Sequence, residues 1–520
     1  MKYPIGIQSF ESLRTDNFLY VDKTSFISRI ANEGRYYFLS RPRRFGKSLF
    51  LSTLEAYFQG KKDLFKDLAI CELENDWKVY PVLHLDMNVD NYTSKTVLDN
   101  VLDDYLSRWE KLYGVEAKAK SASLRLKSVI IAAYEKTGMP VVMLVDEYDK
   151  PLLQTFDNEK LQDEMRNDLK AFYGMLKPLD RYVKLGFFTG VTKFSKVSVF
   201  SDLNNLDDIT MWDDFGTICG ITEEEIHGQL DSEVAEMAVK LDVSKDECYA
   251  RLKKYYDGYH FGTTSEGVYN PFSLLKALKR RSFGSYWFET GTPTFLIEVM
   301  KQTRYPLEEL KDTIATADLL GSMDSIKDSP IPLLFQSGYL TIKGYDEEFQ
   351  TFQLDFPNQE VDEGFTKFLL PYYSPLGKGS ESIFISNFVN EVRSGKPESF
   401  MKRLEALFAD ANYHIMGDAE KYFHNAVYVI FKMLGFYVEV EHATTDGRID
   451  MLVKTKDYIY IMEFKINESA EAALRQIDEK QYAKPFEADG RMIYTIGVNF
   501  STKTKRIDDW NTVLWSDHRS

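Results

Sequence analysis

Short apolar runs separated by amphipathic stretches organise the N-terminal part of the chain. Residues 36–40, Tyr-Tyr-Phe-Leu-Ser, form a run rich in aromatic side chains, which is typical of a buried strand. Similar runs begin near residues 82, 141 and 184. Apolar residues at helical spacing follow the first run from Leu49 onward, and further helical stretches occupy 97–112 and 124–136. Strands that alternate with helices predict an α/β domain with a parallel sheet.

The middle and the end of the chain have different patterns. Thr222 followed by three glutamates predicts a helix with an N-cap and an acidic first turn. Further short helices and a small hairpin, with a turn into a strand across 335–342, predict a winged-helix-like lid. After a linker candidate at 374–380, a helix-rich start leads into strands predicted at 436–441, 449–453 and 458–464. We therefore expect a parallel-sheet domain over 1–218, a helical lid over 219–375 and a smaller α/β domain over 385–520.

Composition and charge limit the function classes. A chain of 520 residues is too long for one hydrophobic core, and a net charge of −16 excludes a protein covered in nucleic-acid-binding surface. Residues 401–520 are nearly balanced, with 16 basic and 19 acidic side chains, so a nucleic-acid site is expected to be local and C-terminal. No apolar run is long enough to cross a bilayer, and the N-terminus lacks the apolar core of a signal peptide. The three cysteines have no metal-ligand spacing, so we expect a protein of the reducing cytoplasm without membrane contact.

Gly46-Lys47-Ser48 lies between the first predicted strand and the helix that follows it, as a P-loop requires. Backbone N–H groups of such a loop hold phosphate oxygens, Lys47 would reach the terminal phosphates of ATP, and the Ser48 hydroxyl would bind Mg²⁺. Arg41 stands where the general pattern has its first glycine. The alternative to a nucleotide site is a chance Gly-Lys-Ser at the start of a helix.

Two further strand ends fit the same chemistry. Four apolar residues deliver Asp146 and Glu147 in a Walker B arrangement, in which Asp146 would hold Mg²⁺ and Glu147 would orient or deprotonate the attacking water. Thr189 ends the next strand and fits a sensor beside the terminal phosphate. Arg43 and Arg44 suit phosphate oxygens, either in place of the missing glycine or on the nucleotide of a neighbour in a homo-oligomer. The alternatives are an acidic or polar strand end and a solvated basic turn.

A second constellation lies near the C-terminus. Gly447-Arg448-Ile449-Asp450 is followed, across a turn, by Glu463-Phe464-Lys465, which is the PD-(D/E)XK pattern of metal-dependent nucleases. The period of two along a strand places Glu463 and Lys465 on one face. Asp450 and Glu463 are hard oxygen ligands for Mg²⁺ or Mn²⁺, with the Phe464 carbonyl as a further ligand, and Lys465 would position the water or stabilise charge on the phosphate. The alternative is a surface hairpin with alternating charges.

Weaker candidates surround this pattern. The segments 473–477 and 481–483 are predicted on a helix, from which Gln476 and Tyr482 would contact substrate phosphates. Glu420 and His424 share a face of the preceding helix and would add a metal ligand or a phosphate contact. Glu441, at the end of a strand, is a comparable minor candidate. For His424 the alternative is an ordinary core or surface histidine.

These motifs together resemble a bacterial family that pairs an AAA-ATPase-like domain with a C-terminal PD-(D/E)XK nuclease domain. The resemblance covers nearly the whole chain, and in that family the P-loop also lacks its first glycine. It implies nucleoside-triphosphate binding and nucleic-acid cleavage, but no particular substrate. The sequences that carry it are Pro4-Ile5-Gly6, Phe10, YVDKT from Tyr20, RPRRFGKSL from Arg41, LVDEYDKP from Leu144, FTGVTKFS from Phe188, FSDLNNLDDIT from Phe200, and the C-terminal DGRID, MEFK and ALRQIDEKQYA.

The sequence therefore predicts an ATP-dependent or ATP-gated nuclease that acts on DNA with Mg²⁺. A second hypothesis, from a different class, is a regulatory ATPase switch whose C-terminal domain binds nucleic acid or a protein partner without cleaving. Metal-dependent cleavage of a plasmid discriminates between the two.

Overall fold

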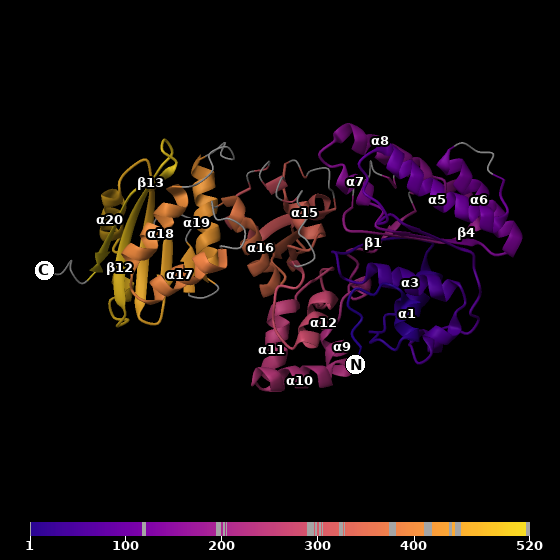
Figure 1. Cartoon of the computed structure of the whole chain (residues 1–520), viewed down its shortest axis with the longest axis horizontal. Coiled ribbons are helices and arrows are strands. Elements are labelled where there is room, and N and C mark those ends of the chain that lie inside the picture. Colours follow the sequence, from indigo (N-terminus) through magenta and orange to yellow (C-terminus); the bar gives the residue numbers. More distant parts are fainter. Residues whose placement is uncertain are drawn as a thin grey trace. The chain divides into compact units, whose positions relative to one another are not determined.

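The computed structural model (Figure 1) divides the chain into two compact units. The first comprises residues 1–303 and 311–361, and the second comprises 304–310 and 362–520. The structure describes residues 2–116, 121–193, 199–200, 203, 205–288, 296, 299–300, 303, 305–321, 326, 328–373, 381–409, 419–435, 439–442 and 449–515. In the chain so described, no helix combines the length and the hydropathy of a membrane span.

A five-stranded parallel sheet forms the centre of the first unit. Its strand order is β2-β3-β4-β1-β5, and every neighbouring pair runs parallel. All side chains of β1 and β3 are buried, because helices cover both faces of the sheet. The predicted α/β class and the four predicted strands are confirmed. The strands are β1 (Tyr36–Ser40), β2 (Val82–Asp86), β3 (Val141–Asp146), β4 (Val183–Gly190) and β5 (Asp207–Asp208).

Helices flank this sheet on both sides, with α1 and α3 on one side and α5, α6 and α8 on the other (Figure 1). Helices α5 and α6 end at Gly114 and Gly138, whose positive φ angles of 77° and 68° favour glycine. The bounds are α1 (Phe10–Thr15), α2 (Ser25–Glu33), α3 (Lys47–Phe58), η1 (Lys62–Phe65), α4 (Ile70–Leu73), α5 (Lys95–Tyr113), α6 (Ala122–Thr137), α7 (Lys150–Gln154), α8 (Glu159–Gly174), η2 (Lys177–Tyr182) and η3 (Asp213–Phe215).

A helical cluster and a small antiparallel sheet complete the first unit. The N-cap predicted at Thr222 is confirmed, since Thr222 and Glu225 form a reciprocal capping box. Phe335 and Gln336, expected in a turn, belong to helix α15, and the turn follows at Gly338, whose φ is 88°. The elements are α9 (Glu223–Gln229), α10 (Asp231–Leu241), α11 (Lys245–Tyr256), α12 (Pro271–Arg280), α14 (Ala317–Leu320), α15 (Ile331–Gln336) and the sheet β6-β8-β7 formed by β6 (Thr313–Thr316), β7 (Thr341–Asp346) and β8 (Thr351–Asp355).

The second unit contains a mixed five-stranded sheet of order β13-β12-β11-β10-β9, in which only the pair β11–β12 is parallel. Helix α20 covers one face, where Ile477 packs with Ile459 and Ile461. On the opposite face, Phe423 of α19 stacks on Phe500 at 4.1 Å between ring centroids. The elements are η5 (Leu307–Leu310), α16 (Gln359–Tyr373), α17 (Glu381–Arg393), α18 (Pro397–Ala409), α19 (Ala419–Gly435), β9 (Glu439–His442), β10 (Met451–Lys454), β11 (Tyr458–Ile466), α20 (Ala470–Glu479), η8 (Lys484–Phe486), β12 (Met492–Ser501) and β13 (Arg506–Leu514).

One predicted helical segment is wrong. Helix α20 ends at Glu479, and Gln481, Tyr482 and Ala483 form turns instead of continuing it. Gln481 has a φ of 52°, in the left-handed region that a right-handed helix cannot continue through, and Pro485 follows shortly afterwards. The linker candidate 374–380 lies outside the described residues.

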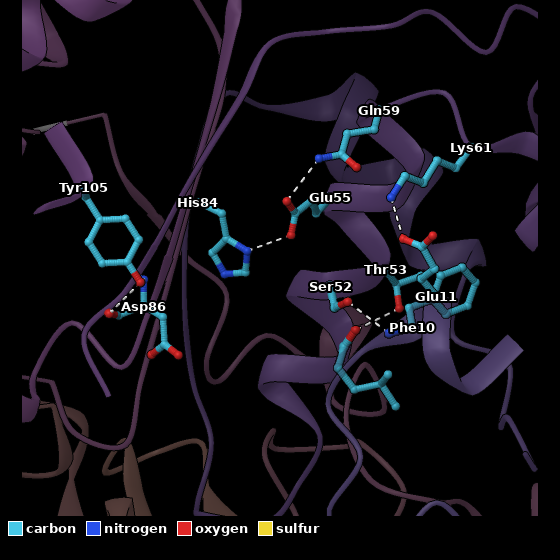
Figure 2. Close-up of polar contacts among 11 residues, drawn as sticks. Phe10, Glu11, Ser52, Thr53, Glu55, Gln59, Lys61, His84, Asp86 and Tyr105 are labelled. Carbon is cyan, nitrogen blue, oxygen red and sulfur yellow. Dashed lines mark hydrogen bonds and ion pairs between the residues drawn. The ribbon is translucent and has the colours of Figure 1, made fainter. Parts of the chain in front are cut away.

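A hydrogen-bonded pair, His84 of β2 and Glu55 of α3, links the sheet to this helix. Figure 2 shows the imidazole of His84 pointing at the carboxylate of Glu55, with 2.8 Å between Nδ1 and Oε2, while Gln59 donates to the other oxygen. Burial would lower the pKa of His84, but the hydrogen bond and charge of Glu55, aided by Asp146 and Asp86, raise that pKa overall. Burial likewise opposes ionisation of Glu55, yet His84 lowers the pKa of its carboxyl.

This pair predicts a pH-dependent part of the stability. The raised pKa of His84 contributes stability that is complete below about pH 6.5, its unfolded value, and is lost as pH rises through the higher folded pKa. The lowered pKa of Glu55 gives a second contribution to stability, which is lost only in acid, as pH falls through the folded pKa of Glu55. Glu55→Gln should therefore lower the free energy of unfolding by about 1 kcal/mol near pH 6 and by less at alkaline pH. Urea unfolding across this range tests it. Asp104→Asn is the control, because it removes an ion pair with Arg108, whose guanidinium keeps its charge across this pH range. The same dependence of stability on pH in Asp104→Asn would contradict the assignment to His84 and Glu55.

Candidate functional site

The loop between β1 and α3 turns through two residues with positive φ before the helix begins. Gly46 has a φ of 101°, which favours glycine, and Arg44 also lies in the left-handed region at 70°. Helix α3 begins directly afterwards at Lys47, so its first N–H groups point towards the loop. The strand, loop and helix expected around Gly46-Lys47-Ser48 are therefore in place.

Arg41, at the position of the missing glycine, is a buried structural residue. Its side chain is 1% exposed, and its guanidinium donates to the carbonyl oxygens of Ser40, Thr210 and Phe215 at 2.7 to 2.9 Å. The guanidinium carbon lies 4.0 Å from the centroid of the Phe261 ring. Burial lowers the pKa of Arg41 to about 10, which still leaves it charged at neutral pH. These contacts fix the start of the loop through Arg41, and the roles expected of Arg43 and Arg44 stay predictions.

Arg41→Gly, which restores the general P-loop pattern, is expected to destabilise the protein. The change removes the donors of three carbonyl oxygens and leaves a cavity against Phe261. Each unsatisfied buried acceptor costs about 1 kcal/mol or more, so we expect a loss of at least about 3 kcal/mol in the free energy of unfolding. Chemical denaturation measures it, with the surface variant Arg108→Ala as a control within about 0.5 kcal/mol of the parent. A parent-like Arg41→Gly protein would contradict this role.

The C-terminal ends of β3 and β4 bring the acidic candidates together. The hydroxyl of Thr189 donates to Oδ1 of Asp146 at 2.5 Å, and the backbone N–H of Glu147 donates to the same oxygen at 3.1 Å. Glu147 has a φ of 50°, so the backbone turns sharply between the two acids. Burial raises the pKa of Glu147, while the charges of Lys47 and Arg43 oppose this. A carboxyl with a raised pKa beside cations fits a group that accepts a proton from water.

Asp149 is a site residue that sequence reasoning missed. Its buried carboxylate accepts hydrogen bonds from the backbone N–H groups of Val191 and Thr192, at 3.1 and 2.7 Å, and from the Thr192 hydroxyl at 2.6 Å. It thereby fixes the segment that follows β4. The only signal for it in the sequence is its place as the third acid of Asp-Glu-Tyr-Asp.

These elements surround a pocket of about 470 Å³, a size typical of small-molecule sites. Lys47 is 5% exposed, and its Nζ donates to the carbonyl oxygens of Arg41 and Pro42 at 2.8 and 3.2 Å. Asp146 and Thr189, by contrast, do not border the pocket but lie next to residues that do. The candidates that line it are Arg43, Arg44, Gly46, Lys47, Ser48 and Glu147, together with Asp149, Lys150, Asn88, Pro271 and the N-terminal segment Pro4 to Gln8.

A smaller pocket of about 90 Å³ shares Pro4, Gly46 and Leu49 with the first. Apolar side chains, including Ile218 and Ile221, form most of its lining. A pocket that carries charged side chains at the loop, beside an apolar pocket that shares lining residues with it, suits a ligand with phosphates at one end and a flat base at the other.

The second constellation assembles between β11 and α20. Glu463 and Lys465 share a face, with Nζ of Lys465 3.3 Å from Oε1 of Glu463. Lys465 also donates to Oε1 of Gln476 at 2.5 Å, and the Gln476 amide donates back to Glu463. Asp450 is held at the start of β10, where its Oδ2 accepts from the backbone N–H of Phe464 at 2.9 Å. Four candidates from three separate segments thus converge.

The electrostatics of this cluster fit a divalent cation. Glu463 is 1% exposed, and its Oε2 has no hydrogen-bond partner among the described residues. Burial and the nearby charge of Asp450 raise the pKa of Glu463 to about 7. Two carboxylates that repel each other in a buried place are stabilised by a cation between them. Within the described ranges no group of three or more His, Cys, Asp and Glu side chains is placed to hold a metal ion. Asp450 and Glu463 offer two carboxylates.

The weaker candidates are placed differently. Tyr482 packs with Ile461 and Ile477 beneath α20, and its buried hydroxyl has no hydrogen-bond partner among the described residues. Glu420 and His424 lie on α19, and Glu441 lies on β9, but their side chains fall outside the described part of the structure. Gly447 and Arg448 are likewise outside the described residues. Of the weaker candidates, Gln476 therefore lies in contact with Glu463 and Lys465. The roles of Tyr482, Glu420, His424 and Glu441 stay predictions.

Comparisons with known proteins match different families at the two ends of the chain. The family described as predicted AAA-ATPase matches residues 4–200, and the PD-(D/E)XK nuclease superfamily matches 418–510. The solved structure of the ORC2 protein of Aeropyrum pernix in ADPNP–ADP complexes is similar over 66% of this chain and 92% of that chain, with 11% identity and a TM-score of 0.22, too low to support an argument. A relative from Azotobacter chroococcum mcd 1, described as an uncharacterized protein in the vnfD 5′ region, is 36% identical over 97% of this chain and 98% of its own length. The chain therefore belongs to the family that joins a predicted AAA-ATPase-like region to a C-terminal region of the PD-(D/E)XK nuclease superfamily.

Proposed function

We propose that the protein hydrolyses ATP in its N-terminal unit and cleaves phosphodiester bonds of DNA in its C-terminal unit with Mg²⁺. The convergence of Asp450, Glu463 and Lys465 around a buried, unpartnered carboxylate oxygen is the observation that carries the nuclease proposal. Burial, together with the charge of Asp450, raises the pKa of Glu463 to about 7. A carboxyl in such surroundings is typical of a functional site and is costly in a merely structural hairpin.

In the nuclease unit, Asp450 and Glu463 would hold Mg²⁺ or Mn²⁺. When bound, this ion polarises the scissile phosphate and lowers the pKa of an attacking water. Lys465 lies beside Glu463 and donates hydrogen bonds, so it orients that water or stabilises negative charge on the phosphate. Gln476 is hydrogen-bonded to both Glu463 and Lys465 and holds the carboxylate and the ammonium in position. The sequence had suggested a contact with substrate phosphates for this residue.

In the ATPase unit, the N–H groups at Gly46 and the start of α3 bind the phosphates, and Lys47 contacts the terminal ones. Ser48 and Asp146 would hold the Mg²⁺ that accompanies ATP. Thr189 fixes the Asp146 carboxylate, and Glu147 takes a proton from the water that attacks the terminal phosphate. The apolar pocket lined by Ile218 and Ile221 accommodates the base.

Cleavage of supercoiled plasmid by the purified full-length protein tests the nuclease proposal. The reactions contain Mg²⁺, Mn²⁺, Ca²⁺ or EDTA, each with ATP, ADP, a non-hydrolysable analogue or no nucleotide, and parallel reactions contain linear DNA, single-stranded DNA and RNA. We expect nicking or linearisation of DNA with Mg²⁺ or Mn²⁺ and none with EDTA. If no polymer is cut under any condition while ATP is hydrolysed, the protein is a regulatory ATPase switch and the nuclease proposal is wrong.

A further inference from the structure

The three arginines of the P-loop segment have three different surroundings. Arg41 is buried and bound to backbone carbonyls. Arg44 turns its guanidinium onto the Phe272 ring, 5.0 Å from the centroid. The guanidinium of Arg43 is exposed and, among the described residues, makes no ion pair or hydrogen bond. Of the three guanidinium groups, that of Arg43 alone makes neither a hydrogen bond, an ion pair nor a ring contact within the part of the chain that the structure describes.

The backbone holds Arg43 in a defined position. The indole Nε1 of Trp287 donates to the Arg43 carbonyl oxygen at 3.3 Å, so an element far along the chain anchors this residue. The left-handed conformation of Arg44, with a φ of 70°, changes the chain direction between the two side chains. Arg43 is thus presented by a fixed loop, which reduces the entropy lost when its side chain binds.

Arg43 also lies beside the proposed general base. Arg43, Lys47 and Glu147 border the same pocket. A water held by Glu147 for attack on the terminal phosphate would therefore have the Arg43 guanidinium nearby.

We propose that Arg43 acts on the nucleotide of its own chain, where it stabilises the charge on the terminal phosphate during hydrolysis. Water oxygen forms a bond to the terminal phosphorus, the bond to the bridging oxygen breaks, and ADP leaves with the electron pair. Glu147 receives the proton of the water, and Arg43 donates N–H bonds to the phosphoryl oxygens, where charge accumulates. The inference rests on the proposed ATP hydrolysis, and it removes the need for an arginine from a second copy.

Steady-state ATP hydrolysis and calorimetric ATP binding by Arg43→Ala test the catalytic role. We expect kcat to fall by about 10³-fold, the lower end for loss of a catalytic arginine, with less than about a tenfold change in Kd. Arg43→Lys should recover little, because an ammonium lacks the bidentate fork. Arg108→Ala, which removes a surface arginine of α5, is the matched control and should hydrolyse ATP like the parent.

Mixing two inactive variants distinguishes the same chain from a neighbour. Lys47→Ala supplies Arg43 but lacks the phosphate-binding lysine, and Arg43→Ala has the reverse defect. We expect an equimolar mixture to be no more active than the sum of its parts, and the specific activity of the parent to stay constant over about a hundredfold dilution. Recovered activity in the mixture, or activity lost on dilution, would assign Arg43 to a neighbour and overturn the proposal. An active parent with a fully active Arg43→Ala variant overturns only this inference, whereas an inactive parent overturns the proposed ATPase as well.

Discussion

Glu147→Gln is expected to reduce kcat for ATP hydrolysis by about 10²- to 10⁴-fold, the usual contribution of a general base. An amide of the same shape fills the same space beside Lys47 and Arg43 but cannot take a proton from water. The phosphate contacts of the loop are untouched, so ATP affinity should stay within a few-fold of that of the parent. Rapid-quench hydrolysis and calorimetric binding measure the two effects separately.

The counterpart of this variant is Lys47→Ala, which should lose binding instead of chemistry. Removal of a charged hydrogen-bond donor to phosphate costs about 1.5 to 3 kcal/mol, or a Kd raised by at least about tenfold. A Glu147→Gln protein that hydrolyses ATP at the parental rate would show that another group takes the proton. Asp149 is then the next acid in the pocket to examine.

Asp450→Ala is expected to reduce DNA cleavage by more than about 100-fold, because even partners of metal ligands contribute about 10- to 100-fold. The change removes one of the two proposed anionic ligands and also the acceptor of the Phe464 N–H. Glu463→Ala should have the same effect. Lys465→Ala should still bind metal, since an ammonium is not a ligand, but should cut slowly.

The same variants should leave ATP hydrolysis nearly intact, because the groups proposed for each reaction all lie within one unit. Both activities are measured on Asp450→Ala, Glu463→Ala, Lys465→Ala and Lys47→Ala, with circular dichroism to verify folding. Lys47→Ala should retain basal cleavage and lose any dependence on nucleotide. A folded Asp450→Ala protein that no longer hydrolyses ATP would mean that the two reactions are strongly coupled.

Local rules explain which elements could be predicted from the sequence. Strand β1 was predicted at its observed bounds because a run of five apolar and aromatic residues is buried on both faces. The helix start at Thr222 depends only on side chains three residues apart. Glu463 and Lys465 share a face because strand geometry alternates with a period of two. The end of α20 could not be predicted, because the left-handed residue there is Gln481 and not a glycine.

Contacts between distant segments explain what the sequence could not show. Gln476 reaches Glu463 and Lys465 only because α20 packs on the face of β11 that carries them. Asp149 acts on Val191 and Thr192, more than forty positions away. The difference between Arg41, Arg43 and Arg44 is likewise invisible in Arg-Pro-Arg-Arg, since it depends on the ring of Phe261, the ring of Phe272 and the indole of Trp287.

The buried guanidinium of Arg41 has an evolutionary consequence. Most phosphate-binding loops begin with a residue that has no side chain, whereas this loop begins with a large cation enclosed by three carbonyl oxygens and an aromatic ring. A single substitution at either position is expected to be costly. A glycine at position 41 would leave three carbonyl oxygens without their donor, and a smaller residue at position 261 would remove the ring that covers the guanidinium. Positions 41 and 261 should therefore be inherited as a pair, and an aligned set of relatives should lose the arginine and the ring together or keep both.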